Sequence, residues 1–187
     1  MIGVALPRDV EHLARIRRWA REPDRRSDKQ YIDGRSAQDS GISAGLPLSA
    51  RWAGIVRATR IPPKYVNFHA SAELAEIQVA VGGTVHQVAT PGKVLGHYLA
   101  YNPFYRVISE ANPKGPTILT GCDVASPAAS TGRDAVAELE AHNAVSGPVY
   151  GAKGDVVLGT KEGSHSFIEV RGLPGDDIYD EPFERLR

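Results

Sequence analysis

The sequence predicts an α/β fold, in which a mostly parallel central sheet is flanked by helices and preceded by an N-terminal helical extension. Short apolar runs, of a length suited to buried strands, alternate with segments that carry helix signals. Two of these runs end in residues whose side chains can act in catalysis, His69 and Cys122. Because the carboxyl ends of parallel strands meet at one edge of a sheet, this fold would bring the two residues together.

Residues 1–61 are expected to form an N-terminal appendage, and residues 62–187 the α/β domain. A helix is predicted from residue 9 to Pro23, which cannot continue it, and its apolar face repeats every three residues at Val10, Leu13, Ile16 and Trp19. Residues 22–45 are polar and rich in Arg, Asp, Ser and Gly, which indicates a long connection. The apolar side chains of residues 46–60 predict a second helix that would pack on the sheet.

Regular strand signals begin at Tyr65. The first strand ends at Phe68, and residues 77–81 and 84–88 form a hairpin around Gly82-Gly83, which is a two-residue turn signal. The apolar run that begins at Pro116 forms the strand that carries Cys122. A strand at residues 148–150 and a hairpin of residues 156–158 and 166–170 complete the set, and the acidic tail from residue 176 is read as a loop.

Two helices are predicted between these strands. Thr90 is a suitable N-cap with Pro91 at the first helical position, and this helix continues until Pro103. The segment from Thr131 to Asp134 resembles a capping box and opens a helix that ends near residue 143 or 147. Together these elements give the strand, helix and strand order of a mostly parallel sheet.

Composition excludes several classes of protein. Lys and Arg total 22 against 22 Asp and Glu, so there is no net field to attract nucleic acid or acidic membranes. A single cysteine cannot form an internal disulfide, and no run approaches the roughly 20 apolar residues of a membrane span. The six histidines and one cysteine show no paired metal-ligand spacing, so no metal and no cofactor are expected. A soluble protein without a signal peptide follows.

The thiol and the imidazole suggest a cysteine-histidine dyad. A free cysteine has a pKa near 8.5 and is only a few per cent thiolate at neutral pH, and the thiolate is the attacking species. A neighbouring imidazole can raise that fraction. The alternatives are a buried, inert Cys122 and a structural His69 bonded to a backbone carbonyl.

Two stretches resemble the caspase-hemoglobinase (clan CD) fold of cysteine peptidases, and its bacterial toxin and adhesin branches most. Residues 66–71, Val-Asn-Phe-His-Ala-Ser, are similar to the family's strand and His-Gly-Ser element. Residues 118–126, followed by a helix and a strand at 147–152, resemble its cysteine strand, helix and strand pattern. The resemblance covers roughly residues 62 to 160, about half the chain. His69 precedes Cys122 by 53 positions, close to the spacing of roughly 50 in one such family, although the local Q-A-C-x-G signature is absent.

The resemblance implies roles for individual residues. Cys122 and His69 would be catalytic, and the backbone amides of Cys122 and Ala70 would form the oxyanion hole, although Ala70 stands where the family usually has glycine. The loop after the strand at 148–150 would help to build the substrate pocket. Asp123 is a further candidate for substrate binding, together with Tyr150, Lys153 and Asp155 from that loop.

The implied function is a cysteine endopeptidase that cleaves a target protein or peptide, as a bacterial toxin or effector protease. It would act in the bacterial cytoplasm or be delivered as a secreted effector, and an immunity protein or a delivery protein would be its partner. One alternative is a catalytically inactive caspase-like module that binds a partner. Another is a toxin domain with NAD-directed chemistry, for which the support is the polar, Gly-rich N-terminal half.

Overall fold

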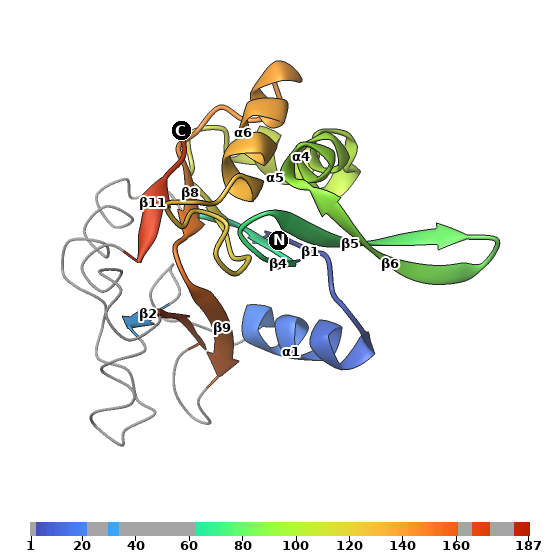
Figure 1. Ribbon diagram of the computed structural model, residues 1–187, viewed down its shortest axis with the longest axis horizontal. Coiled ribbons are helices and arrows are strands. Elements are labelled where there is room, and N and C mark those ends of the chain that lie inside the picture. The colour runs from blue at the N-terminus through green and yellow to red at the C-terminus, as the bar shows by residue number, and fades with distance from the viewer. Residues whose placement is uncertain (1–2, 22–29, 34–62, 161–165, 173–181) are drawn as a thin grey trace.

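The computed structural model of the chain describes residues 3–21, 30–33, 63–160, 166–172 and 182–187 (Figure 1). Its centre is a five-stranded sheet of strand order β1-β3-β7-β8-β11, where β1 is Gly3–Ala5, β3 is Lys64–Asn67, β7 is Thr117–Leu119, β8 is Val149–Ala152 and β11 is Phe183–Arg185. Neighbours from β1 to β8 pair in parallel, and β11 pairs antiparallel with β8. The predicted α/β class with a mostly parallel sheet is confirmed.

One face of the central sheet carries three helices, α4 (Gly92–Tyr101), α5 (Pro103–Ala111) and α6 (Thr131–Ala141), which lie together above it in Figure 1. Val66, Leu119 and Val149 point to this side and are each no more than 1% exposed. They pack with Leu95 and Leu139 from the helices. The period of two along each strand therefore places one residue of each pair in this larger core.

The alternate strand residues form a second core on the opposite face, where α1 (Val10–Arg21) packs. Tyr65 and Ile118 point to this side, next to Trp19 of α1. The Trp19 and Tyr65 rings meet edge to face with centroids 5.1 Å apart. The predicted N-terminal helix is confirmed, and its buried stripe consists of Ile16 and Trp19, while Val10 is exposed.

Two small sheets extend the central one. In the first, β10 (Ser166–Arg171) pairs antiparallel with β9 (Asp155–Thr160) and in parallel with β2 (Gln30–Asp33). The predicted hairpin of the C-terminal part is thus confirmed. Ile168 and Val170 of β10 are fully buried against the second core.

The second small sheet consists of β4 (His69–Ala70), β5 (Leu74–Val81) and β6 (Thr84–Pro91) and includes the predicted hairpin. Val81 pairs with Thr84 around the two-residue turn, where Gly82 and Gly83 have φ of +57° and +83°. Both glycines adopt left-handed conformations that other residues rarely take, as a type I′ turn requires. The hairpin projects away from the body of the molecule (Figure 1).

The predicted helix caps are wrong in detail. Helix α4 begins at Gly92, and its N-cap is Pro91, without a side-chain hydrogen bond. Thr90, the predicted N-cap, is still in β6 and donates to the carbonyl of Ala75. Helix α6 has Ser130 at its N-cap, also without a side-chain bond. Thr131 instead donates its hydroxyl to the carbonyls of Ser71 and Ala72. In both cases tertiary contacts, rather than the helix terminus, use the hydroxyl.

Helix α5 was not predicted from the sequence. Pro103 indicated the end of a helix, and it does follow α4, but it also starts α5 at the position that proline favours. The side chain of Asn102 caps α5 by accepting from the amides of Phe104 and Tyr105. A single residue thus ends one helix and caps the next.

The N-terminal segment contributes to the sheets. Strand β1 pairs with β3 in the central sheet, although residues 1–61 were assigned to an appendage. Residues 30–33, assigned to the connection, form β2. The predicted helix over residues 46–60 lies outside the described residues. Among the helices that the structure describes, none has the length and apolar character needed to cross a membrane.

Candidate active site

The two strands that precede the candidate dyad lie side by side. β3 and β7 pair in parallel up to Val66 and Leu119, and the amide of Thr120 donates to the carbonyl of Val66 over 2.9 Å. His69 and Cys122 each follow this last pair by three residues. The two segments stay in contact beyond the strands, because the ring of Phe68 lies so close to Gly121 that a Cβ there would be 2.7 Å from it.

The Cys122 thiol is partly buried beneath the start of β9. Its Sγ accepts a hydrogen bond from the amide of Val156 over 3.3 Å. Burial raises the pKa of the thiol, and the carboxylates of Asp155 and Asp123 raise it further, while the bond from Val156 acts in the opposite direction. Both carboxylates therefore lie close enough to affect the sulfur. The resting group at neutral pH is a protonated thiol.

Backbone bonds hold the cysteine turn against the connection from β8 to β9. The amide of Asp123 donates to the carbonyl of Gly154 over 3.1 Å, and that of Ala125 to Ala152 over 2.9 Å. Asp123 has a φ of +54°, a left-handed conformation that aspartate tolerates better than most residues. This attachment brings Asp155 next to Cys122, although 33 positions separate the two in the sequence.

His69 lies on β4 and contacts helix α1. Its Nε2 and the Nδ1 of His12 form a hydrogen bond of 3.1 Å, and the ring centroids are 4.5 Å apart. The amide of Arg8 also donates to His12 Nδ1, over 3.1 Å. Because an amide can only donate, His12 Nδ1 must be an acceptor, and His69 Nε2 must then carry the proton. In neutral His69 the free lone pair is therefore on Nδ1.

The same surroundings keep both imidazoles uncharged. Burial lowers the pKa of His69, with Arg8 and Arg15 contributing and Glu76 opposing. Burial likewise lowers the pKa of His12, and His69 adds to that effect. If His12 were protonated, its Nδ1 could no longer accept hydrogen bonds from the Arg8 amide and from His69 Nε2. The pair is therefore held in the neutral form.

Sequence analysis missed His12. It lies four residues before Ile16 and seven before Trp19, on the same face of α1 as these buried side chains. A histidine within the buried stripe of an amphipathic helix was the available signal. Its partner could not be known, because the contact joins residues 57 positions apart.

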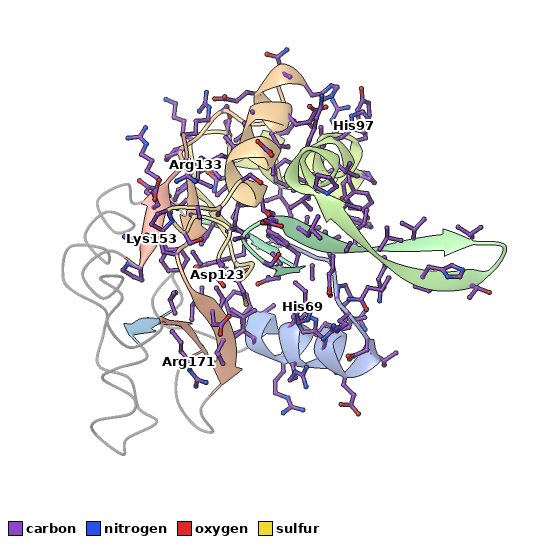
Figure 2. The ribbon with its side chains drawn as sticks, viewed as in Figure 1. His69, His97, Asp123, Arg133, Lys153 and Arg171 are labelled. Carbon is purple, nitrogen blue, oxygen red and sulfur yellow. The ribbon has the colours of Figure 1, made fainter. Side chains whose placement is uncertain are left out.

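The thiol and the His69 imidazole have different partners in the structure. Sγ bonds to Val156, and the ring of His69 bonds to His12. Within the described part of the chain, no hydrogen bond joins Cys122 to His69. In Figure 2, His69 lies directly above α1 and Asp123 lies near the start of β9. The two candidate groups thus follow adjacent strands of the central sheet and bond to different partners.

The amide of Ala70 is oriented away from β5. Ser71 donates its amide to the carbonyl of Leu74, which makes this a hydrogen-bonded pair of the antiparallel ladder. Since such pairs alternate, the neighbouring pair of Ala70 and Ala75 is of the non-hydrogen-bonded type. The Ala70 N–H therefore points out from the free edge of β4, as a donor in an oxyanion hole would.

The other predicted substrate-binding residues do not all lie together. Asp123 and Asp155 act on the Cys122 thiol. Tyr150 is only 8% exposed and packs in the second core, so its ring contributes to stability rather than to an open pocket wall. Lys153 donates its amide to Pro182 over 2.9 Å, and Figure 2 shows it beside β11.

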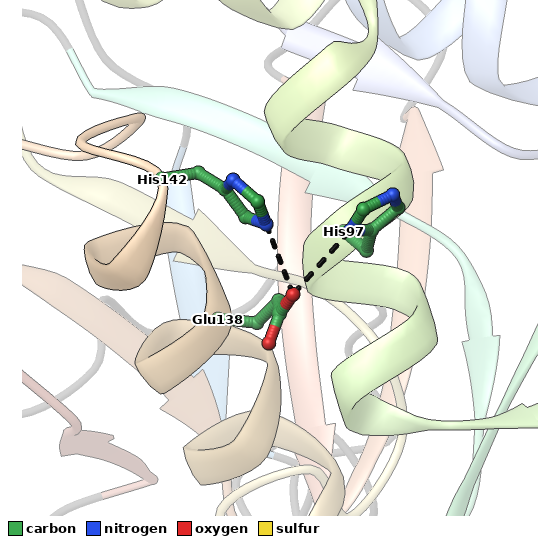
Figure 3. Close-up of side chains that lie close together, drawn as sticks. All are labelled: His97, Glu138 and His142. Atoms are coloured by element: carbon green, nitrogen blue, oxygen red, sulfur yellow. Dashed lines mark hydrogen bonds and ion pairs between the residues drawn. The ribbon is translucent and has the colours of Figure 1, made fainter.

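A second cluster of ionisable side chains lies on the helical face. His97 of α4 contacts Glu138 of α6 and, through it, His142 at the end of that helix (Figure 3). These three are a group of histidine and carboxylate side chains that could hold a metal ion. Glu138 and His142, four positions apart, were the available sequence signal, since this spacing places them on one helix face.

Comparison with known proteins does not extend this description. No protein-family model, no curated protein and no solved structure matches the chain.

Proposed function

We propose that the protein is a cysteine endopeptidase of caspase-like fold, with Cys122 as the nucleophile and His69 as the general acid and base. The observation that carries this is the parallel register of β3 and β7, in which both residues follow the pair Val66 and Leu119 by the same three positions. The α/β architecture with helices on both faces of the sheet supports the resemblance.

The reaction begins from a neutral thiol and a neutral imidazole. As Sγ attacks the carbonyl carbon of the scissile peptide, the thiol proton passes to Nδ1 of His69, and the C–S bond forms. The developing oxyanion accepts from the amides of Ala70 and Cys122, each worth about 3 kcal/mol where such donors have been measured. His69 then gives its proton to the leaving amine, and the C–N bond breaks.

Hydrolysis of the thioester completes the cycle. His69, neutral again after protonating the amine, takes a proton from a water molecule whose oxygen attacks the acyl carbon. The C–S bond breaks, and the proton returns to the sulfur, which restores the thiol. The two groups have separate partners in the free protein, so the scheme requires substrate binding to bring them together, as happens in many active sites.

The two carboxylates beside the nucleophile favour a basic residue before the cleaved bond. Asp123 and Asp155 both raise the pKa of the Cys122 thiol, which means that their negative charges lie near the reacting atom. Asp155 is also exposed to solvent. A lysine or arginine side chain of the substrate would bind these carboxylates and relieve their effect on the thiol.

Mapping of new protein amino termini tests this function. Expression of the protein in a bacterial host is expected to create new termini, with Lys or Arg before the cut, that are absent when Cys122→Ala is expressed. The role of a toxin or effector protease further predicts that these cuts fall in proteins needed for growth. A catalytically inactive partner-binding module, which the raised thiol pKa favours, would give identical termini for both proteins.

His12 is expected to position His69 through its Nδ1 acceptor. His12→Leu removes this acceptor and should lower kcat/KM about 10- to 100-fold, the range found when partners that orient histidine ligands are removed. His12→Asn, whose amide oxygen can replace Nδ1, should restore most of the loss. If the role of His12 were purely structural, His12→Asn would restore no more of kcat/KM than His12→Gln.

The pH profile provides a second test of the same pair. Because burial lowers the pKa of both His69 and His12, activity should persist as the pH falls below about 6.5, the ordinary value for histidine, and disappear only at the lower pKa. In His12→Leu the acidic limb should shift. An unchanged limb would indicate that His12 does not act on His69.

A further inference from the structure

We propose that His97, Glu138 and His142 bind one divalent transition metal ion, with Zn²⁺ as the best match, and that this ion fastens α4 to α6. The three residues come from the two helices that pack together on the upper face of the sheet (Figure 3). They lie outside the candidate active site. The binding therefore does not depend on the proposed peptidase activity.

The separations of the three ligand atoms suit a metal ion. Nδ1 of His97 and Nε2 of His142 lie 3.3 Å and 3.0 Å from the same oxygen, Oε1 of Glu138, and one atom from each residue lies within 4.8 Å of the others. Ligands about 2.0 to 2.2 Å from a tetrahedral Zn²⁺ are roughly 3.3 to 3.5 Å apart. A small closure between the two imidazoles would thus complete three corners of a tetrahedron.

Close packing of the two helices holds the ligands in place. A Cβ at Gly92 would lie 2.1 Å from the carbonyl oxygen of Thr131, and one at Gly96 would lie 2.4 Å from that of Ala135 and 2.8 Å from Cβ of Glu138. The backbones of α4 and α6 therefore approach as closely as glycine allows. His97 follows Gly96 directly, so this contact brings its ring within reach of the carboxylate.

Both imidazoles can present a lone pair to the ion by a change of tautomer. The ring nitrogens that face Glu138 donate to its carboxylate, and metal binding requires each proton to move to the other nitrogen of the same ring. For His142 this is Nδ1, which faces the Tyr101 hydroxyl at 3.5 Å. For His97 it is Nε2, on a side chain that is 58% exposed. The Tyr101 ring also contacts both imidazoles, tilted against His97 with centroids 4.8 Å apart and edge-on to His142 with centroids 5.2 Å apart.

The carboxylate supplies the negative charge that a cation requires. Its oxygen Oε1 already accepts from both imidazoles, so this charge lies where the ion would bind. The Glu138 side chain is 15% exposed and that of His142 is 29% exposed, so the ligands are shielded on one side. The open side leaves room for water, as in zinc sites with three protein ligands.

The choice of metal follows from the ligand set. Two imidazole nitrogens and one carboxylate oxygen suit Zn²⁺, Co²⁺, Ni²⁺ and Cu²⁺, whereas Ca²⁺ and Mg²⁺ prefer an all-oxygen shell. Zn²⁺ accepts the tetrahedral arrangement without an electronic preference. Zn²⁺ is therefore expected to bind, and Mg²⁺ and Ca²⁺ are not.

Metal titration of the full chain tests the site. The background should carry Cys122→Ala and His69→Ala, which removes the thiol and separates the His12 pair as competing ligands. Zn²⁺, titrated against a chromophoric chelator, is expected to bind this protein with one ion per chain. His97→Ala, His142→Ala and Glu138→Gln should each raise Kd at least about 10-fold. Co²⁺ should give the visible absorption of a tetrahedral site, which the same variants lose.

The matched control is His86→Ala, because His86 is an exposed histidine on β6 outside the cluster. It should leave Kd unchanged. Zn²⁺ at roughly 100 times Kd should also raise Tm of the background protein by at least about 5 °C and that of His97→Ala by much less. Circular dichroism identifies a variant that fails to fold, and His97→Gln then replaces it. Absence of one-to-one binding, or binding that survives all three cluster substitutions, would overturn the proposal.

Discussion

Alanine at position 122 or at position 69 is expected to lower kcat/KM for peptide cleavage at least about 1,000-fold, and the double variant should be no worse than either single one. In the proposed reaction the thiol and the imidazole act as one unit, so removing either abolishes the same step. The measurement uses a peptide that contains a cleavage site found by terminal mapping. Kinetics of the two single variants and the double variant complete the cycle.

The control for this cycle is His86→Ala, since it also replaces a histidine but on the projecting hairpin. It should retain the activity of the unmodified protein. Additive losses in the double variant would show that Cys122 and His69 contribute independently and would contradict the dyad. Full activity in His69→Ala would leave Cys122 without a base and exclude the proposed chemistry.

Replacing Trp19 with alanine is expected to lower the free energy of unfolding by about 3–5 kcal/mol, the usual cost of removing a large buried aromatic side chain. Trp19 is 1% exposed, and it contacts Tyr65 edge to face within the second core. Its loss would leave a cavity between α1 and the central sheet. Denaturant unfolding monitored by circular dichroism measures the change.

Val10→Ala is the matched control, because Val10 begins the same helix but is 83% exposed. It should change the free energy of unfolding by no more than about 0.5 kcal/mol. Because α1 also carries His12, the Trp19→Ala protein should lose the hydrogen bond between His12 and His69 before the whole protein unfolds. Equal effects of the two substitutions would indicate that α1 does not pack on the sheet as described.

The strand and hairpin pattern could be predicted because it depends on local signals. Apolar runs of strand length predicted β3, β7 and β8, and Gly82-Gly83 predicted the turn between β5 and β6. The helix caps were predicted poorly, because Thr90 and Thr131 have the right side chains for capping but bond to distant carbonyls. Local propensity cannot show which of two acceptors a hydroxyl will reach.

The candidate site was predictable in part for the same reason. Positions at the ends of apolar strands predicted that Cys122 and His69 belong to one sheet edge. The strands that precede them, β3 and β7, are adjacent and parallel, whereas the dyad itself stays a prediction. Tyr150 was assigned to the pocket because of its loop, whereas the period of two along β8 turns its ring into the second core. His12 and the group of His97, Glu138 and His142 were missed, because they are brought together by contacts between distant segments.

By itself, the sequence determined the strands and helices that carry strong local signals, because backbone geometry and apolar periodicity act over a few residues. It did not reveal α5, nor the strands β1, β2 and β11, which lie in segments assigned to an appendage, a connection and a terminal loop. Only the tertiary structure decided which side chains meet. The glycines of α4 let α6 approach and bring together three side chains that could hold a metal ion, and helix α1 places one histidine against another. Such contacts depend on how whole elements pack, and packing is set by the sum of many distant side chains rather than by any local pattern.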